Sequence, residues 1–544
     1  GIHAHLAAKR RHDRGIVLHA LRSMVALLVL LVPATCIGLT LPLLIGVETR
    51  QVTNFGTRLA WLYACNTLGA VLGSLGAEFV LIGSLGLIGT AGFASGCNLV
   101  AAMLVYGLKR GGSGAAPPAI VAGRGDRAPG PHGASPMRIR TLLAAAMLSG
   151  FNLLALEILW FRFLQLFFNG TTKMFAIMLA LVLLGLSLGG MIAGRLCRQG
   201  SQPWLIRPFY LLSGAYLVLS YAALPYFQSF FATPGDGRSL TLAAVCTFLT
   251  LPICVLSGAL FGLIGQLLHG LVRHPVRSAG LLTLANTIGA TAGPLLGAFF
   301  LLPVLGIEKG IFVIAVLYGA AALLVREPSA PGVRRWLRPA LQAAGFAGVL
   351  ACFPFGLMRY SFFGQVAARL PDATLLQANE GLTETSFYFR HDAMGQPFYH
   401  RLVTHGYSMS SSDPRSKRYM KLFALVPLAL HPEARDALLL CFGVGSTASA
   451  LVASPGLNTS DVGDSSRDIL DASGLLFPAP ARNPLRDPRV TTRVEDGRFF
   501  LQTTRRTYDL ITGEPPPPKI AGVVNLYTEE FFRLVRRRLN AGGC

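Results

Sequence analysis

Residues 438–447 read Leu-Leu-Leu-Cys-Phe-Gly-Val-Gly-Ser-Thr. An apolar run enters a Gly-x-Gly turn at Gly443 and Gly445, and a helical pattern follows from Ala448. This order predicts a strand, a tight turn and a helix N-terminus, which together typically cradle a nucleotide-like ligand. The turn alone is a weak signal, so its meaning depends on the rest of the chain.

Strand and helix patterns alternate around this turn. Such alternation predicts a doubly wound parallel sheet that binds its ligand at the carboxyl ends of the strands. Two earlier strands, joined by a turn at residues 392–396, predict an antiparallel hairpin. The expected strands are 385–389, 397–403, 438–442, 460–463, 490–494 and 508–512, and the expected helices are 418–430, 466–475, 499–503 and 528–539.

Acidic residues follow three of the expected parallel strands. Asp464 lies about twenty residues after the glycine turn, where an acid typically binds ribose hydroxyls. Asp496, before Gly497, is placed to hold the exocyclic amine of a purine. Glu514 enters a run of four prolines and is the expected catalytic base. Acids at successive strand ends predict one adenosyl-type pocket.

The composition predicts many membrane spans. Of 544 residues, 52% are hydrophobic and only 14% are charged, which is too apolar for an ordinary soluble protein. The net charge of +22 is concentrated in short loops between apolar runs, as positive-inside topology predicts, so no nucleic acid partner is expected. The nine cysteines form no CxxC pair, and therefore neither a metal site nor a disulfide framework is indicated.

A multi-pass membrane domain is expected over residues 1–358, with a linker at 109–138 between two related halves. A linker and β-hairpin are expected at 359–412, and an incomplete Rossmann-like domain at 413–544. Apolar runs long enough to cross a bilayer number about ten on the hydropathy rule. They lie near residues 20–46, 59–83, 85–108, 140–168, 173–195, 205–227, 240–268, 279–303, 308–325 and 339–358.

An internal repeat links the two halves of the membrane domain. Residues 66–87 align without a gap with residues 286–307, and 10 of the 22 positions are identical. Duplicated helical bundles are common in transporters. Ionisable residues inside spans are candidate functional sites, and Glu78, Glu157 and Arg162 are the ones of interest. For Glu157 and Arg162 a structural ion pair is favoured over a transport site.

From about residue 379 to 543 the chain resembles spermidine synthases, and most closely the bacterial forms fused to a multi-pass membrane domain. The resemblance rests mainly on Asn483-Pro-Leu-Arg-Asp-Pro-Arg489, Glu495-Asp-Gly-Arg-Phe-Phe-Leu501, Tyr508-Asp-Leu-Ile511 and Asn525-Leu-Tyr-Thr-Glu-Glu-Phe531. It implies a methyltransferase-type fold and an enzyme of polyamine biosynthesis in the bacterial inner membrane. The face on which the soluble domain lies is left open.

The resemblance also implies roles for individual residues. The catalytic acid that accepts a proton from the attacking amine falls on Glu514. The residues implied to bind the cofactor are Gly443, Gly445, Ser446, Asp464, Asp496 and Gly497, and those near the substrate are Tyr407, Met409, Tyr419 and Tyr527. The expected cofactor is decarboxylated S-adenosylmethionine or S-adenosylmethionine, without a metal. Lys421, Leu425 and Pro517 depart from the pattern, because they stand where the family has polyamine-side residues.

Three functions are carried forward. The leading hypothesis is a membrane-anchored aminopropyltransferase-like enzyme, in which an amine attacks a sulfonium carbon. The rivals are an S-adenosylmethionine-dependent methyltransferase and an amine transporter with a ligand-sensing domain. Expected partners are the lipid bilayer and a small amine, with a homodimer left open. A chain that starts at Gly1 and stops at Cys544 after a helix is further expected to be a fragment whose sheet lacks later strands.

Overall fold

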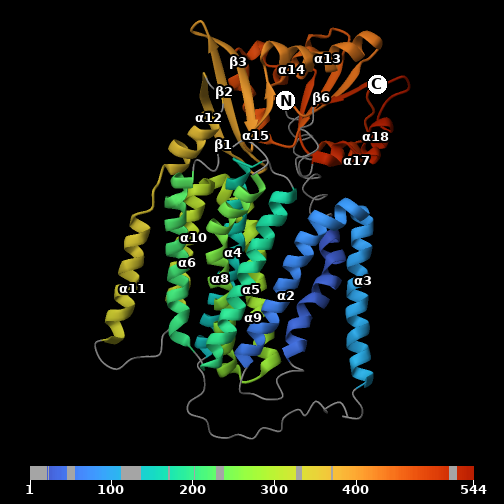
Figure 1. Ribbon diagram of the computed structural model, residues 1–544. Coiled ribbons are helices and arrows are strands. Elements are labelled where there is room, and N and C mark those ends of the chain that lie inside the picture. The colour runs from blue at the N-terminus through green and yellow to red at the C-terminus, as the bar shows by residue number, and fades with distance from the viewer. Residues whose placement is uncertain are drawn as a thin grey trace.

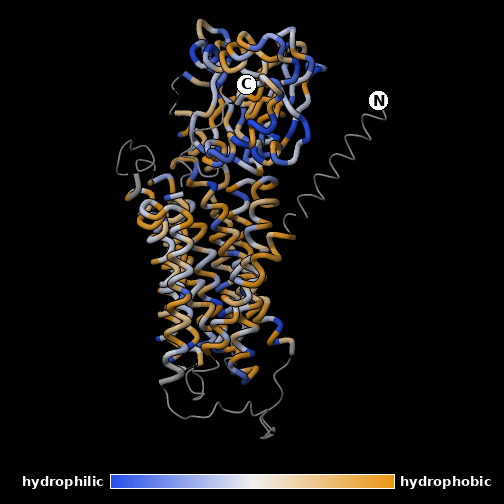
Figure 2. The backbone as a smooth tube through the Cα atoms, turned by 90° about the vertical axis from the view of Figure 1, so that its right-hand side faces the viewer, coloured by the Kyte–Doolittle hydropathy of each residue, from blue (hydrophilic) through white to orange (hydrophobic). Residues whose placement is uncertain are grey.

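The protein consists of a long helical bundle capped at one end by an α/β part (Figure 1). This is a computed structural model, and it describes residues 21, 24–45, 55–111, 136–168, 172–200, 202–227, 238–325, 334–368, 370, 372–513 and 523–544. Apolar residues predominate along the bundle, whereas hydrophilic residues gather in the cap (Figure 2). The division between an apolar helical part and a more polar α/β part agrees with the predicted fold class.

The helices of the bundle run nearly along one axis (Figure 1). They are α2 Phe55–Gly76, α3 Ile82–Gly111, α4 Pro136–Gln165, α5 Thr172–Arg198, α6 Ile206–Ala223, α8 Arg238–Val272, α9 Pro275–Leu296, α10 Gly306–Leu324 and α11 Arg334–Ala351. Short segments of 3-10 helix or π-helix, labelled η, join or extend these helices, and the short helix α12 Gly364–Ala368 follows the last of them. They are the π-helical η2 Ala77–Leu81, η5 Gly297–Leu305 and η6 Met358–Phe363 and the 3-10 helices η3 Pro203–Leu205 and η4 Leu224–Phe227. Glycines allow several helices to pack closely, and a Cβ on Gly289 would collide with the carbonyl oxygen of Met147.

Seven helical segments of the described chain are long and apolar enough to cross a membrane, rather than the ten expected from hydropathy. Two of these segments, 55–107 and 275–324, each contain two expected spans, which follow one another directly across a kink without an intervening loop. The expected span 339–358 is not among the seven, since α11 ends at Ala351 and begins with basic residues. The linker region 112–135 lies outside the described residues.

The two combined segments kink at equivalent positions. Gly86 and Gly306 both adopt positive φ, 67° and 75°, and each follows a π-helical stretch, η2 or η5. Positive φ is readily available to glycine because it has no Cβ. The two glycines are separated by the same 220 residues as the predicted repeat. The duplication itself remains an inference from the sequence.

A four-stranded antiparallel sheet connects the bundle to the rest of the cap. Its strands, in spatial order, are β1 Ala373–Glu380, β2 Thr385–Ala393, β3 Gln396–Thr404 and β4 Tyr407–Ser411. The predicted hairpin is its centre, and β1 and β4 flank it. Side chains alternate in direction along β2. Phe387 therefore packs on the bundle core, 5.0 Å from the ring of Phe363, while Tyr388 joins the core of the α/β domain.

The second sheet is parallel, with the order β7-β6-β5-β8. Its strands are β5 Asp436–Leu440, β6 Thr459–Asp464, β7 Val490–Val494 and β8 Leu510–Gly513. The associated helices are α13 Pro414–Leu430, α14 Ser446–Ala453, α15 Arg467–Asp471, α16 Ser473–Leu476, α17 Gly497–Thr503 and α18 Glu529–Arg536. This is the predicted Rossmann-like arrangement. Its strand order reverses at β5, so the end of β5 is the place where such sheets bind ligands.

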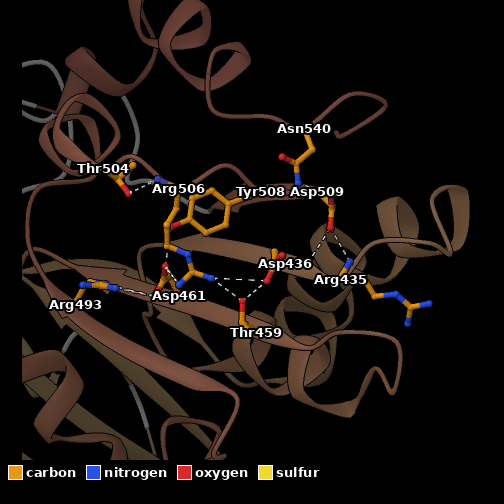
Figure 3. A network of polar contacts seen from close by, with 10 residues as sticks. All are labelled: Arg435, Asp436, Thr459, Asp461, Arg493, Thr504, Arg506, Tyr508, Asp509 and Asn540. Atoms are coloured by element: carbon orange, nitrogen blue, oxygen red, sulfur yellow. Dashed lines mark hydrogen bonds and ion pairs between the residues drawn. The ribbon is translucent and has the colours of Figure 1, made fainter. Parts of the chain in front are cut away.

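A buried acid on β6 links this strand to β7 and to the segment that precedes β8. Asp461 of β6 is fully buried, and its carboxylate accepts hydrogen bonds from Arg493, Arg506 and the Tyr508 hydroxyl (Figure 3). The Tyr508 Oη–Asp461 Oδ2 distance is 2.6 Å. Because a buried charge is tolerated only when it is paired and hydrogen-bonded, this network holds β6 in register with β7 and with the start of β8.

Candidate active site at the strand ends

The glycine turn leaves the end of β5 with three positive φ angles. Cys441, Gly443 and Gly445 have φ of 70°, 55° and 75°, and α14 begins at Ser446. A Cβ on Gly443 would lie 2.8 Å from Ser410 Oγ of β4, which is too close for any other residue without a shift. Glycine is therefore required at 443 by both conformation and space.

Asp464 stands at the end of β6 and braces the glycine turn. Its Oδ2 accepts a hydrogen bond from the Phe442 backbone amide at 2.9 Å, and its Oδ1 accepts one from the Ser466 amide at 3.0 Å. Burial raises the pKa of this carboxyl, and the backbone amides oppose that shift. The residue is only 6% exposed, so a further hydrogen bond to its carboxylate would come from a group inside the cavity that it lines.

Asp496 follows β7 and caps the next helix. Its Oδ1 accepts a hydrogen bond from the Phe499 amide at 2.8 Å, which satisfies one free amide at the N-terminus of α17. Gly497 comes next, and a Cβ there would lie 3.2 Å from the Leu440 side chain of β5. The local Asp-Gly sequence thus begins a helix and lets that helix approach the neighbouring strand.

One cavity of about 630 Å³ lies over these strand ends and unites most of the predicted site; it is called the glycine-loop cavity below. The predicted residues that line it are Tyr407, Met409, Gly443, Ser446, Asp464, Asp496 and Gly497. Residues from β5, β6, β4 and the β7–α17 junction meet there because the carboxyl ends of parallel strands share one edge.

Three predicted residues are not brought to this cavity. Gly445 faces the rings of Phe442 and Phe477 instead. Tyr419 is 45% exposed and lines a separate surface hollow, because α13 turns the adjacent Met420 inward. Tyr527 is 41% exposed and does not line the glycine-loop cavity. Glu514, the predicted catalytic base, lies outside the described residues.

Among the other polar residues that line the cavity, Glu384 and His405 are ionisable and were not assigned a role from the sequence. Glu384 precedes β2, and His405 follows β3. Burial raises the pKa of Glu384 to about 7, and the Asp464 charge adds to this effect. Burial lowers the pKa of His405 to about 3, with a further contribution from Arg162, so this imidazole is neutral at physiological pH. Glu384 Oε1 and His405 Nδ1 have no hydrogen-bond partner within the described part of the chain.

The floor of the cavity belongs to the bundle. Phe161 and Gln165, in the last turn of α4, line it together with the α/β residues. Nothing in the local sequence indicates this, because the two parts of the cavity are more than 200 residues apart in the chain. The apolar pattern of α4 identifies only a membrane helix.

Arg162 connects the helical bundle to the α/β part of the protein. Its guanidinium donates hydrogen bonds to the carbonyl oxygens of Gly381 at 3.0 Å and Leu382 at 2.9 Å, in the turn that leads to Glu384. The expected ion pair between Glu157 and Arg162 is therefore wrong: a spacing of five residues, about 1.4 helical turns, directs the two side chains to different faces of α4, and the Arg162 side chain extends toward the β1–β2 turn. A second link is the hydrogen bond from the Ile307 amide to Glu380 Oε1 at 2.9 Å.

The remaining candidates give no second polar site. Glu78 is half-buried and accepts a hydrogen bond from Thr172 at 2.7 Å, which is a contact within the bundle. Among the described residues there is no group of three His, Cys, Asp or Glu side chains that could hold a metal ion.

Comparisons with known proteins identify the C-terminal part. Residues 416–544 match the spermine/spermidine synthase domain. The polyamine aminopropyltransferase of Nitrosomonas europaea is 27% identical over 169 residues, which cover 31% of this chain and 52% of that protein. The polyamine aminopropyltransferase of Corynebacterium efficiens is 27% identical over 396 residues, or 67% of this chain and 72% of that protein, so this match extends into the helical bundle.

Solved structures of spermidine synthases are similar only in part. The enzyme from Thermotoga maritima and a spermidine synthase in complex with the transition state analogue AdoDATO are each 18% identical. They cover 30% of this chain, with TM-scores of 0.27 and 0.28 and with 54% and 55% of their own chains matched. This chain spans about half the length of several curated relatives that it matches.

Proposed function

We propose that this chain, in which residues 416–544 form a spermine/spermidine synthase domain, is a membrane-anchored aminopropyltransferase-like enzyme of polyamine metabolism. The observation that carries the proposal is that Gly443, Asp464 and Asp496 follow three adjacent strands and line one cavity. The order of these strands places the cavity at the edge where a Rossmann-like sheet binds its ligand.

The cavity residues suit decarboxylated S-adenosylmethionine as the group donor. Asp464 can accept hydrogen bonds from ribose hydroxyls, and Asp496 can accept one from the adenine amine. Gly443 allows the backbone to approach the ligand. The sulfonium and the ammonium of the donor are cationic, and the cavity supplies carboxylates from Glu384, Asp464, Glu495 and Asp496.

The same charges argue against the intact form of the donor. S-adenosylmethionine carries an additional carboxylate, and an acidic lining repels it. This disfavours the methyltransferase alternative, which uses that form. The proposal therefore predicts that decarboxylated S-adenosylmethionine binds more tightly than S-adenosylmethionine, which the methyltransferase alternative does not predict.

In the proposed reaction the lone pair of an amine nitrogen attacks the aminopropyl carbon next to sulfur. The carbon–sulfur bond breaks, its electrons stay on sulfur, and neutral 5′-methylthioadenosine leaves. The nitrogen then gives up a proton to a base. Glu384, whose carboxylate lines the cavity and has a pKa of about 7, is one candidate for this base, and Glu514 is the candidate implied by the sequence.

Insertion of the bundle in the bacterial inner membrane is part of the proposal. It is supported by the seven long apolar segments and by large apolar side chains on their outer surface, such as Leu72 and Val105, which are 69% and 68% exposed. Exposed apolar area of this extent is favourable only in a lipid environment or against a protein partner. The membrane face that carries the α/β domain is left open.

Isothermal titration of the detergent-purified protein with the two donors tests this function. We expect decarboxylated S-adenosylmethionine to bind at least about tenfold more tightly than S-adenosylmethionine, a difference of about 1.4 kcal/mol. Asp464→Asn should weaken binding of the donor, whereas Asp471→Asn, an exposed acid on α15, should leave it unchanged. Equal affinity, or a preference for the intact form, would contradict the aminopropyl assignment.

A further inference from the structure

A second cavity, called the lateral cavity here, adjoins the glycine-loop cavity. Its volume is about 730 Å³, and Ser465, Glu495 and Asp496 line both. The two spaces therefore meet at the carboxylates that follow β7. From there the lateral cavity extends between the α/β domain and the bundle, where Phe299 of η5 and Leu382 form part of its wall.

Phe299 places one wall of the lateral cavity on a membrane-crossing segment. It belongs to the 275–324 segment, one of the seven that can span a bilayer, and its side chain is 66% exposed. Phe300 beside it is 55% exposed. A molecule in the lateral cavity can thus contact the apolar surface of the bundle and, at its other end, the carboxylates over the sheet.

The charge distribution distinguishes the two ends of this path. The inner end has the acidic side chains of Glu384, Glu495 and Asp496, which attract one ammonium group. The rest of the lateral cavity is lined by the cation Arg498, by the neutral Gln502 and by the apolar side chains of Phe299, Leu382, Val494 and Phe499. Arg498 is held in place, because its Nη1 donates to the Asn525 carbonyl oxygen at 3.1 Å. A second ammonium there would meet a positive charge and an apolar wall, so a diamine is poorly matched.

We propose that the acceptor is a primary amine on an apolar chain, which enters along the lateral cavity from the bilayer surface. This inference rests on the aminopropyl transfer proposed above. The amine nitrogen forms the new bond to the aminopropyl carbon, 5′-methylthioadenosine leaves with the electrons of the carbon–sulfur bond, and a carboxylate of the cavity takes the proton. The apolar chain stays against Phe299 and Leu382 during the reaction.

The test compares two acceptors, dodecylamine and 1,4-diaminobutane, with the full-length protein in lipid nanodiscs and decarboxylated S-adenosylmethionine as donor. Release of 5′-methylthioadenosine and the mass of the alkylated amine are measured. We expect kcat/KM for dodecylamine to exceed that for 1,4-diaminobutane by about tenfold or more, which corresponds to about 1.4 kcal/mol of apolar contact.

The repeat supplies a matched control. Phe79 stands 220 residues before Phe299, on the related segment η2; it is 50% exposed and lines neither cavity. Phe299→Ser should lower kcat/KM for dodecylamine by about five- to tenfold and leave that for 1,4-diaminobutane unchanged, because the substitution removes the apolar ring against which the alkyl chain packs. Phe79→Ser should change neither value.

Failure of this inference is distinguishable from failure of the proposed function. Preference for 1,4-diaminobutane, or equal effects of the two substitutions, would overturn the apolar acceptor and leave the transferase assignment in place. Absence of 5′-methylthioadenosine release with both amines would overturn both. Titration of each variant with the donor checks that the glycine-loop cavity is intact.

Discussion

Arg162 Nη1 donates a hydrogen bond to the carbonyl oxygen of Gly381 across 3.0 Å, and these residues are 219 positions apart in the chain. Through this contact a membrane-type helix holds the turn that carries Glu384 into the glycine-loop cavity. The bundle is therefore a structural part of the candidate site.

Arg162→Ala should loosen the α/β domain from the bundle. It removes two hydrogen bonds from a charged group, each of which contributes roughly 1.5–3 kcal/mol. We expect a lower thermal unfolding midpoint in detergent and at least a tenfold loss of aminopropyl transfer. Arg140→Ala, at an exposed arginine of the same helix, is the control. Wild-type stability and activity in Arg162→Ala would show that the contact is not needed.

Glu384→Gln should alter how stability depends on pH. The pKa of Glu384 is raised from 4.5 to about 7 in the folded protein, so the folded state holds this proton more tightly than the unfolded chain. The free energy of unfolding should consequently fall as the pH rises from about 4.5 to 7, by at most about 3.5 kcal/mol at about 1.4 kcal/mol per pKa unit. Glu384→Gln should flatten this dependence in thermal melts recorded across the range.

The dependence of kcat on pH provides a second test of the role of Glu384. If it accepts the proton, kcat rises with pH near 7 in the wild type and loses that rise in Glu384→Gln. Glu433→Gln, an acid whose side chain is 85% exposed, is the control for both measurements. A profile that survives Glu384→Gln and disappears in Glu514→Gln would assign the base to Glu514.

Gly443→Ala should impair donor binding with a smaller effect on folding. The new Cβ would lie 2.8 Å from Ser410 Oγ, and alanine at positive φ costs roughly 1–2 kcal/mol. Displacement of the turn should weaken donor affinity by about tenfold in a calorimetric titration. Gly456→Ala is matched to it, because its nearest neighbour would be 3.8 Å away and its φ is not positive. Equal affinities of the two variants would contradict the role of the turn.

Asp461→Ala should destabilise the sheet. Removal of this fully buried carboxylate takes an ion-pair partner from Arg493 and from Arg506, and Arg506 keeps its contacts with Asp436 and Thr459. Because both arginines are partly exposed to water, the cost should be smaller than the about 3–5 kcal/mol of a fully buried pair but larger than that of a surface pair. Chemical denaturation should detect this as a lower midpoint. Asp392→Ala breaks a half-exposed pair with Arg390 and should cost less than about 1 kcal/mol. A similar midpoint for both variants would argue against the network.

Part of the site was predictable because it is encoded locally. Gly443, Asp464 and Asp496 each stand at the end of an expected strand or within a few residues of it, and a parallel sheet gathers such positions at one edge. Tyr419 was expected near the substrate because the resemblance to spermidine synthases implied it. The structure puts Met420 there instead, since the rotation of α13 is set by its packing on α14 and β8, which no local pattern encodes.

The sequence by itself determined the apolar helical part, the strand–turn–helix order and the acids at the strand ends, because helix and strand periodicity and turn residues act over a few positions. Only the tertiary structure decided that Phe161 and Gln165 form the floor of the cavity and that Arg162 binds Gly381 rather than Glu157. It likewise decided the burial of Glu384. These features depend on contacts between segments about 200 residues apart, whose partners are chosen by packing and by the need to satisfy buried polar groups.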